Sequence, residues 1–550
     1  MSAVLTHSGS HDSDNKIKQS PSTDKGCVET TELAAVVEQS RKERLSGIFT
    51  IICSGFALIS DGLQNNIMTL TNVVFGQLYG KELYTAAYST QVSNALTVGT
   101  ILGQISIGLL CDYKGRKWGI VLSTICIVVG VILATAAHGS GNDLRRNFTG
   151  FIWFLTVARG LTGIGVGGEY PSSSTSSVEA ANERMQKQRG PVFIMVTNFV
   201  LSFGGVFAAA LYLIVFEAAG GLNANLSTVW RTVFGISVLP PLVVFIFRLR
   251  MLNSQLYRKG AIQASVPYRL VIRYYWKSLI GTAGTWWFDL QKSAISARRA
   301  TFDPCVSAPN SPTSSPFADR QSMSIVPNGV FSGSIIANIV KATGKEKIRK
   351  TAEWQLLLST LGLPGCIIGA LIVNRLGRRN LMIFGFAGYL LIGLIVGIAY
   401  PQLSQPSRVG IFIFLYGSLN LMGNLGPGNT LGLTSAESYA TSVRGTCYGI
   451  SAAVGKLGAV LGTETFTPIR DNLGQRYTFI VAAACGLLGI VVAYFFVRND
   501  LGGDLGDEDA KFEAYLRSNG WDGQIGASQQ EGLEVVEAEA GKGEDDKLAL

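Results

Sequence analysis

Ionisable side chains stand inside apolar stretches at several places in this chain. Asp61 lies in "LISDGLQNN", Glu169 follows "FIWFLTVARGLTGIGVGG", and Lys456 lies in "SAAVGKLGAVLG". A charged residue within such a segment costs about 2.5–3.5 kcal/mol on membrane-insertion scales, so it is a functional candidate. A desolvated carboxyl group can exchange a proton near neutral pH, and a buried lysine needs an anionic partner. Arg159, within the same run as Glu169, would pair with a carboxylate or an anion.

Each of these residues also has a purely structural explanation. Asp61 and its amide neighbours fit an interior hydrogen-bonded network, and Glu169 fits a helix-end carboxylate at the membrane interface. Lys456 fits a side chain that extends along the helix to reach water. Gly163 and Gly167 favour a tighter site around Glu169, because small residues four positions apart let two helices approach closely.

The composition places these residues in a membrane protein. Of the 550 residues 47% are hydrophobic and 15% are charged, and the mean hydropathy is +0.30. Soluble domains carry about 25% charged residues. The net charge of +9 comes mostly from short basic segments between apolar runs, which indicates cytoplasmic loops and not nucleic-acid binding. The cysteines form no C-x-x-C pair, so we expect no metal site.

Apolar segments of membrane-spanning length divide the chain into two series. We expect an all-α membrane protein with twelve transmembrane helices in two six-helix halves. The predicted spans lie near 47–70, 84–110, 118–137, 150–170, 191–216, 229–247, 276–288 with 325–341, 354–373, 380–399, 409–434, 446–463 and 477–497. The predicted organisation is a disordered cytoplasmic leader at 1–43, an N-terminal half at 44–247, a cytoplasmic central loop at 248–275, a C-terminal half at 276–498 and an acidic cytoplasmic tail at 499–550.

The basic loops also predict an orientation. Four of them, at 113–118, 182–190, 247–260 and 374–380, belong on the cytoplasmic side, which places both termini inside. The glycosylation sequons at Asn147 and Asn225 then fall outside.

An internal repeat supports a duplicated architecture. "GLLCDYKGRK" contains Gly108, Asp112, Gly115 and Arg116, and "GALIVNRLGRR" repeats its ending with Asn374, Gly377 and Arg378. Each copy follows the second apolar span of its half. Duplicated halves are common in secondary transporters, whose substrate site lies between the repeats near mid-membrane.

The two loops resemble the signature of the major facilitator superfamily. "GVGGEYPSSSTSSVEAANE" (165–183) and "SVRGTCYGISAAVGKLGA" (442–459) are similar to the fungal phosphate:proton symporter family, and the glutamate of "GGEYPSS" to its glycerophosphodiester branch. The resemblance, over roughly residues 45–500, implies proton coupling through Asp61, Glu169 and Asp289. It implies substrate binding through Tyr170, Asn198, Trp286, Asn429 and Lys456.

The seventh span departs from the family pattern. "GTAGTWWFD" (281–289) matches its beginning and "VPNGVFSGSII" (326–336) its end, but a polar, Pro- and Ser-rich segment at 290–323 separates them. Such a segment does not fit in hydrocarbon. We interpret it as unspliced intron sequence or a gene-model error, with an extruded loop as the alternative, and sequencing the transcript decides between them.

Three other functions compete with phosphodiester transport. The spacing of Gly163, Gly165 and Gly168, with Glu183 further on, matches a dinucleotide fingerprint, but its flanks are membrane spans and not a strand and a soluble sheet. A transporter-like scaffold without transport would lack the coupling carboxylates. A carrier of inorganic phosphate, a sugar or a secondary metabolite would keep the fold.

We therefore expect a proton-coupled importer of a phosphate-bearing organic anion, most simply a glycerophosphodiester such as glycerophosphoinositol. We expect no enzymatic activity, cofactor or nucleic-acid partner. The remaining partners would be protons and the bilayer of a plasma membrane, and the protein would act as a monomer.

Overall fold

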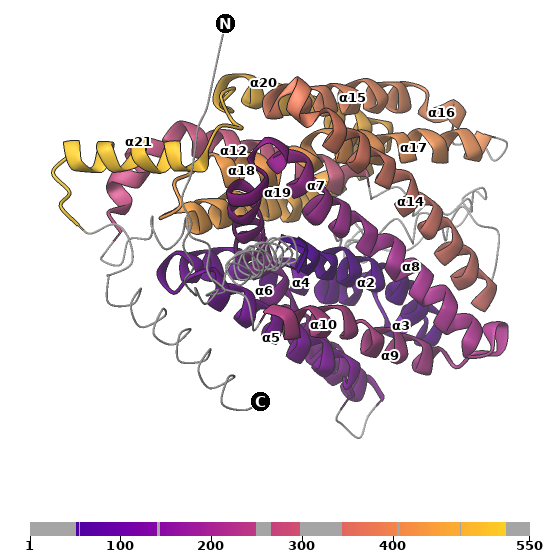
Figure 1. The fold of residues 1–550 in the computed structure, drawn as a ribbon. Helices are drawn as coiled ribbons and strands as arrows, with labels where there is room; N and C mark the ends of the chain where they lie inside the picture. The colour runs from indigo at the N-terminus through magenta and orange to yellow at the C-terminus, as the bar shows by residue number, and fades with distance from the viewer. Residues whose placement is uncertain are drawn as a thin grey trace, which may run out of the picture. The chain divides into compact units, whose positions relative to one another are not determined.

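Helices make up all the regular structure in the described part of this computed structural model (Figure 1). The structure describes residues 51–53, 55–139, 144–248, 266–296, 344–403, 408–473 and 475–523. The predicted leader at 1–43 lies outside these residues. The interpretation as a dinucleotide-binding site is wrong. Its glycines lie within the single helix α6 (Leu144–Met185), without the strand that such a site requires.

The first half covers the first six predicted spans. Its elements are η1 (Phe56–Leu58), α2 (Ile59–Leu78), α3 (Gly80–Leu83), α4 (Ala86–Tyr113), α5 (Arg116–Thr135), α6, η2 (Gln186–Gln188), α7 (Arg189–Ile194), η3 (Met195–Phe199), α8 (Val200–Ala218), η4 (Gly221–Asn223), α9 (Leu226–Ile236) and α10 (Leu239–Arg248).

The second half covers the remaining spans as far as they are described. Its elements are α12 (Tyr268–Ser296), α14 (Gly344–Leu376), α15 (Arg378–Ile398), α16 (Tyr400–Leu403), α17 (Val409–Gly423), η6 (Asn424–Gly428), α18 (Asn429–Glu437), α19 (Arg444–Leu473), α20 (Gln475–Phe496) and α21 (Leu505–Ser518). Helix α12 begins at residue 268, inside the predicted central loop. It continues seven residues beyond Asp289, and the segment 297–343, with most of the predicted insertion, lies outside the described residues.

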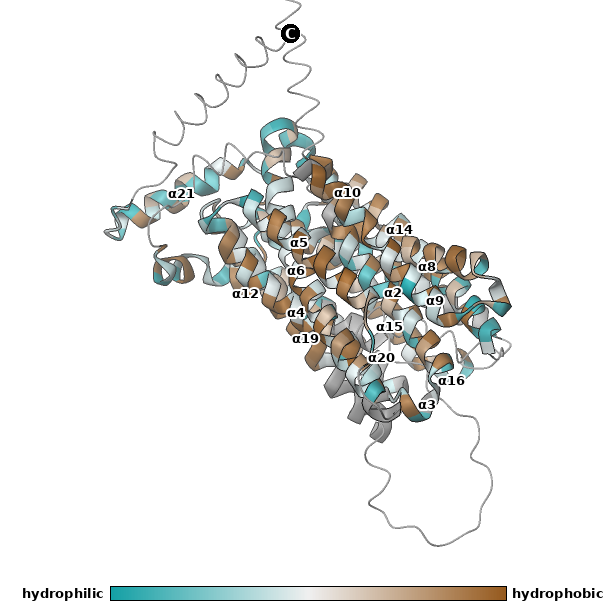
Figure 2. Ribbon diagram, turned by 90° about the horizontal axis from the view of Figure 1, so that it is seen from below, coloured by the Kyte–Doolittle hydropathy of each residue, from teal (hydrophilic) through white to brown (hydrophobic). Residues whose placement is uncertain are grey.

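The distribution of side chains is that of a protein whose solvent is lipid. Large apolar side chains such as Leu371, Ile398 and Phe495 are more than 70% exposed, whereas Arg116 and Glu169 are buried. Figure 2 shows apolar residues along the bundle helices and hydrophilic residues concentrated in α21 and at helix ends. Six helical runs in the described part are long and apolar enough to cross a membrane, including one of 72 residues that contains two predicted spans.

The glycines before Glu169 pack α6 against its neighbours, as the spacing of Gly163 and Gly167 predicted. A Cβ atom on Gly163 would collide with the backbone oxygen of Leu96, and one on Gly167 with that of Thr100, both in α4. A Cβ atom on Gly165 would likewise collide with the backbone oxygen of Ser123 in α5. Glycine therefore allows three helices to meet at backbone contact beside Glu169.

The two halves meet along two helix pairs, α4 with α19 and α8 with α14. These pairs are equivalent, because each joins the second helix of one half to the fifth helix of the other. The arrangement is the one expected from two duplicated halves.

Candidate functional site

A cavity of about 320 Å³ lies between the two halves. Its walls come from α2, α4, α6 and α8 on one side and from α12, α14, α15, α17, η6 and α19 on the other. The volume lies at the small end of the range of small-molecule sites. Of the described residues that line it, those with charged side chains are Asp61, Asp289 and Lys456.

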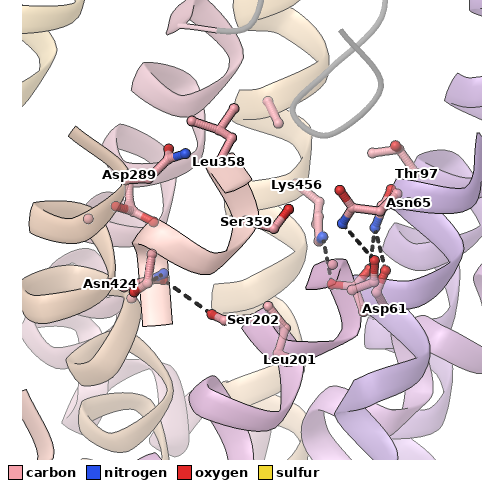
Figure 3. A pocket seen from close by; sticks show the side chains of 18 of the residues that line it. Asp61, Asn65, Thr97, Leu201, Ser202, Asp289, Leu358, Ser359, Asn424 and Lys456 are labelled. Atoms are coloured by element: carbon pink, nitrogen blue, oxygen red, sulfur yellow. Dashed lines mark hydrogen bonds and ion pairs between the residues drawn. The ribbon is translucent and has the colours of Figure 1, made fainter. Parts of the chain in front are cut away.

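Asp61 and Lys456 form the charged centre of this cavity. The Lys456 ammonium lies 3.4 Å from the Asp61 carboxylate, and the two side chains are 14% and 5% exposed. The Asn65 amide donates to the same carboxylate at 2.6 Å, and the Tyr170 hydroxyl donates to its other oxygen. The ammonium also lies 5.4 Å from the centre of the Tyr170 ring. Figure 3 shows Lys456 and Asn65 directed at Asp61.

The aromatic side chains predicted for substrate binding also lie together. Tyr170 and Trp286 meet edge to face with their rings 6.1 Å apart. The Trp286 indole donates to the Ser435 hydroxyl at 3.0 Å, so its polar edge points to α18. Asp289, one turn further along α12, lines the cavity directly. The structure thus brings Asp61, Tyr170, Trp286, Asp289 and Lys456 to one region.

Asn198 and Asn429 meet each other at a different place. The Asn198 amide donates to the Asn429 side-chain oxygen at 2.7 Å. The Asn429 amide donates to the backbone oxygens of Gly365 and Cys366 in α14, at 3.3 and 3.2 Å. Neither asparagine is among the described residues that line the cavity. Their contacts tie η3, α14 and α18 together, and their assignment to substrate binding stays a prediction.

The tenth span widens beside Asn429. Residues Asn424–Gly428 form one turn of π-helix between α17 and α18. Pro427 lacks an N–H group and cannot continue the α-helical hydrogen bonding, so the backbone bulges there. This π turn directs Asn424 into the cavity wall.

Glu169 and Arg159 are both buried in α6. Glu169 is fully buried and lies beside Tyr170 in sequence, but it does not line the described cavity. The Arg159 guanidinium donates to the backbone oxygens of Val92 at 3.1 Å and Gln64 at 3.5 Å. It makes no ion pair with a residue in the described part of the chain, so the predicted carboxylate partner is not found there.

The first signature loop joins the two halves through an ionic network. Arg116 pairs with Asp112 at 2.7 Å and with Glu179 at 2.9 Å, and Arg444 from the second half reaches Glu179 at 2.8 Å. Asp112 accepts the backbone N–H groups of Gly445 at 2.9 Å and of the residue that follows at 2.6 Å. A carboxylate at a helix N-terminus satisfies N–H groups that have no partner within the helix, here those of α19.

Close packing and turn geometry support this loop. Gly108 lies against α19, because a Cβ atom there would be 2.8 Å from the Gly445 oxygen. Gly115 and Gly377 have φ values of 97° and 81°, a region that favours glycine.

The second signature loop repeats this network with one charge fewer. Arg378 pairs with Glu437 at 3.0 Å, and Arg189 from the first half reaches Glu437 at 2.8 Å. Asn374 accepts from Arg378 at 3.2 Å and donates to the backbone oxygen of Lys187 at 3.0 Å. Asparagine here joins two backbone segments without the negative charge that Asp112 brings to the first copy.

The sequence reasoning missed the partners in these networks. Glu179, Arg189, Glu437 and Arg444 were not singled out, although an Arg-Gly pair recurs at 189–190 and 444–445. That recurrence was the available signal, because both pairs begin the fifth helix of a half.

The two predicted glycosylation sites are exposed. Asn147 lies at the beginning of α6. The side chain of Asn225 accepts from the backbone of Ser227 at 3.0 Å and caps α9.

Comparison with known proteins gives a consistent result. The model of the family described as "Sugar (and other) transporter" matches residues 47–262 and 331–508. The chain is 46% identical to glycerophosphoinositol permease 1 of Candida albicans, over 93% of this chain and 91% of that protein. It is 44% identical to glycerophosphoinositol transporter 1 of Saccharomyces cerevisiae, over 92% and 89%. The proton:xylose symporter XylE bound to 6-bromo-6-deoxy-D-glucose shares the fold, with a TM-score of 0.64 and 14% identity over 85% of this chain and 100% of that one.

Proposed function

Because the chain belongs to the family of sugar and other transporters, within the major facilitator superfamily, we propose that it is a proton-coupled importer of a glycerophosphodiester such as glycerophosphoinositol. The observation that carries this proposal is the pairing of Lys456 with Asp61 in the cavity between the halves. A lysine there provides the positive charge that a phosphodiester requires.

Coupling follows from the charge balance of this pair. With Asp61 ionised, Lys456 is already neutralised, and an arriving anion would be left without a partner in a poorly hydrated site. Protonation of Asp61 removes its charge and frees Lys456 for the phosphodiester. Proton and anion therefore bind favourably together and each alone binds poorly.

Glu169 and Asp289 are the further proton sites in this proposal. Asp289 lines the same cavity. Glu169 is fully buried beside Tyr170, whose hydroxyl contacts Asp61. Loss of a proton from Glu169 would change the charge next to the substrate, although Glu169 does not contact the substrate.

Alternating access would be a rocking of the two halves. The networks around Glu179 and Glu437 join the halves on the signature-loop side, which we assign to the cytoplasm. They would open when the cavity faces inward. We further propose that both termini are cytoplasmic, that Asn147 and Asn225 are glycosylated outside, and that the carrier acts as a monomer in the plasma membrane.

Inorganic phosphate is the second candidate substrate. The charged centre favours it, because Lys456 would recognise phosphate whatever group is esterified to it. A neutral sugar carries no negative charge that this lysine could neutralise.

Uptake measurements distinguish these substrates. Cells lacking their own carriers would express the chain and receive labelled glycerophosphoinositol or labelled phosphate at two pH values. We expect glycerophosphoinositol uptake that increases at the lower pH and is lost in Glu169→Gln. Uptake that ignores pH, or an unchanged rate in Glu169→Gln, would refute the coupling role.

A further inference from the structure

The cavity has a second polar region, separate from its charged centre. Asn66 of α2, Ser202 of α8, Ser359 of α14, Asn420 of α17 and Asn424 of η6 all line it. We call these five residues the amide–hydroxyl wall. In the view of Figure 3, Asn424 and Ser202 lie on one side, Lys456 and Asp61 on the other, and Ser359 between them.

Helix register brings the second-half members of the wall together. The Asn424 amide donates to the backbone oxygen of Gly362 at 3.1 Å, and Asn429 is bonded one turn further along both helices. The segments therefore run in the same direction. Ser359 precedes Gly362 by about one turn, and Asn420 precedes Asn424 by one turn, so Ser359 and Asn420 occupy the same level.

These two side chains have unused hydrogen-bonding capacity. Neither the Ser359 hydroxyl nor the Asn420 amide bonds to any residue in the described part of the chain. By contrast, Ser202 donates to Asn424 at 3.4 Å, and Asn66 accepts from Gln355 at 3.0 Å. The wall thus combines members held in place by their neighbours with members free to meet a ligand.

Gly205 of α8 makes room for the wall. A Cβ atom there would lie 3.0 Å from the Asn66 amide nitrogen and 3.3 Å from the Ser359 hydroxyl. Both groups therefore face the same point on α8, and any larger residue at 205 would narrow the cavity at that point.

The chemistry of the wall suits a neutral group with many hydroxyls. Amide and hydroxyl side chains both donate and accept hydrogen bonds, as each hydroxyl of a polyol does. We propose that the amide–hydroxyl wall binds the polyol headgroup of the substrate while Lys456 binds its phosphodiester. This proposal rests on the function proposed above and adds the residues that select the headgroup.

A quaternary ammonium headgroup fits the wall less well. Such cations are held by several aromatic faces, and the aromatic residues among the described lining are Tyr170 and Tyr389. The Tyr170 ring already lies under the Lys456 ammonium. The carboxylate of Asp289 can also accept hydrogen bonds from hydroxyls, so it does not exclude a polyol.

The test compares three labelled substrates in Ser359→Ala and Asn420→Ala. Glycerophosphoinositol carries the polyol, glycerophosphocholine replaces it with a quaternary ammonium, and glycerol phosphate lacks a headgroup. Loss of one hydrogen bond should raise the KM for glycerophosphoinositol about fivefold to tenfold. The KM values of any other substrates transported should change less than about twofold, which also shows that the variants fold. Ser418→Ala is the matched control, because this α17 serine lies outside the cavity lining.

Two results would overturn the proposal, and they are distinguishable. If the unmodified protein transports glycerophosphoinositol but both variants keep its KM, or weaken all substrates equally, the wall does not select the headgroup. If the unmodified protein does not transport glycerophosphoinositol at all, the proposed substrate is wrong and the headgroup site with it.

Discussion

Lys456 and Asp61 come from opposite halves of the molecule, and their charged groups lie 3.4 Å apart in the cavity between those halves. In the proposed rocking mechanism, this contact joins two halves that move relative to each other. Whatever neutralises one member changes both the charge available to the substrate and the connection between the halves.

The first prediction concerns the two members of this pair. Lys456→Gln should abolish uptake and destabilise the protein, because it leaves the Asp61 carboxylate without its cation. Breaking a buried pair on one side costs about 3–5 kcal/mol, and this pair, being slightly hydrated, should fall below that range. Adding Asp61→Asn should restore thermal stability but not uptake. Melting in detergent, measured beside uptake, checks this, and a double variant as unstable as Lys456→Gln would contradict the pairing.

The second prediction concerns the contact between Asn198 and Asn429. Replacing either residue with alanine removes the hydrogen bond between them and leaves the partner's polar groups unpaired, in Asn429 buried and in Asn198 half-buried. The free energy of unfolding should fall by about 1–3 kcal/mol for each variant, and the double variant should lose less than the sum, by about 0.5–1.5 kcal/mol. Thermal or denaturant unfolding of all four proteins measures this coupling. Strictly additive losses would show that the two side chains act independently.

The third prediction concerns the ionic network at Glu179. Glu179→Gln should weaken the contacts of Arg116 and Arg444 and open the signature-loop side more often. Cys447, which is 3% exposed near this interface, would then react several times faster with a membrane-impermeant thiol reagent in inside-out vesicles. Cys447→Ser gives the background. An unchanged labelling rate in Glu179→Gln would mean that this network does not hold the side closed.

The fourth prediction concerns α21, which packs on the signature-loop side. The Asn182 amide donates to Asp504 at 2.8 Å and holds the pKa of that carboxyl below its usual range. A hydrogen bond from Arg498 likewise lowers the pKa of Asp500. A carboxyl whose folded pKa is depressed stabilises the fold above its unfolded pKa, near 4, and loses that effect as the pH falls through the folded pKa.

Burial acts in the opposite direction on Asp509. It raises the pKa of this carboxyl, which accepts from Thr441. Protonation of Asp509 in acid thus favours the fold and opposes the effect of Asp500 and Asp504. We expect the two carboxyls with depressed pKa values to dominate, so hydrogen exchange of the amides of α21 should stay slow at neutral pH and quicken in acid, after correction for intrinsic rates. Asp504→Asn should reduce this acid sensitivity. Equal acid sensitivity with and without the substitution would show that Asp504 does not contribute to the pH dependence of α21.

The sequence predicted the helices and the ionisable residues of the site better than their contacts. Hydropathy located the spans because lipid imposes a minimum apolar length, and the cost of burying a charge marked Asp61 and Lys456. Their direct contact depends on how α2 and α19 meet across the halves, which no local pattern encodes. The amide–hydroxyl wall was not predicted for a related reason. Serines and asparagines are common in transmembrane helices, and Asn424 reaches the cavity from the π turn, which the sequence did not predict.

The usual position of carboxylates at the ends of membrane spans also explains why the two ionic networks were not predicted. Glu179 and Glu437 lie at the ends of spans, where a carboxylate ordinarily meets water. Only the folded structure surrounds each with two arginines, one from its own half and one from the other.

Proton movement driven by glycerophosphoinositol, in vesicles reconstituted with the purified chain, would show directly whether substrate and proton cross together. A trapped pH indicator would report the lumen while labelled substrate is added outside, without an imposed pH gradient. We expect acidification that follows glycerophosphoinositol entry in the unmodified protein and is absent in Asp61→Asn. Substrate entry without acidification, or equal acidification in Asp61→Asn, would contradict coupling through the Lys456–Asp61 pair.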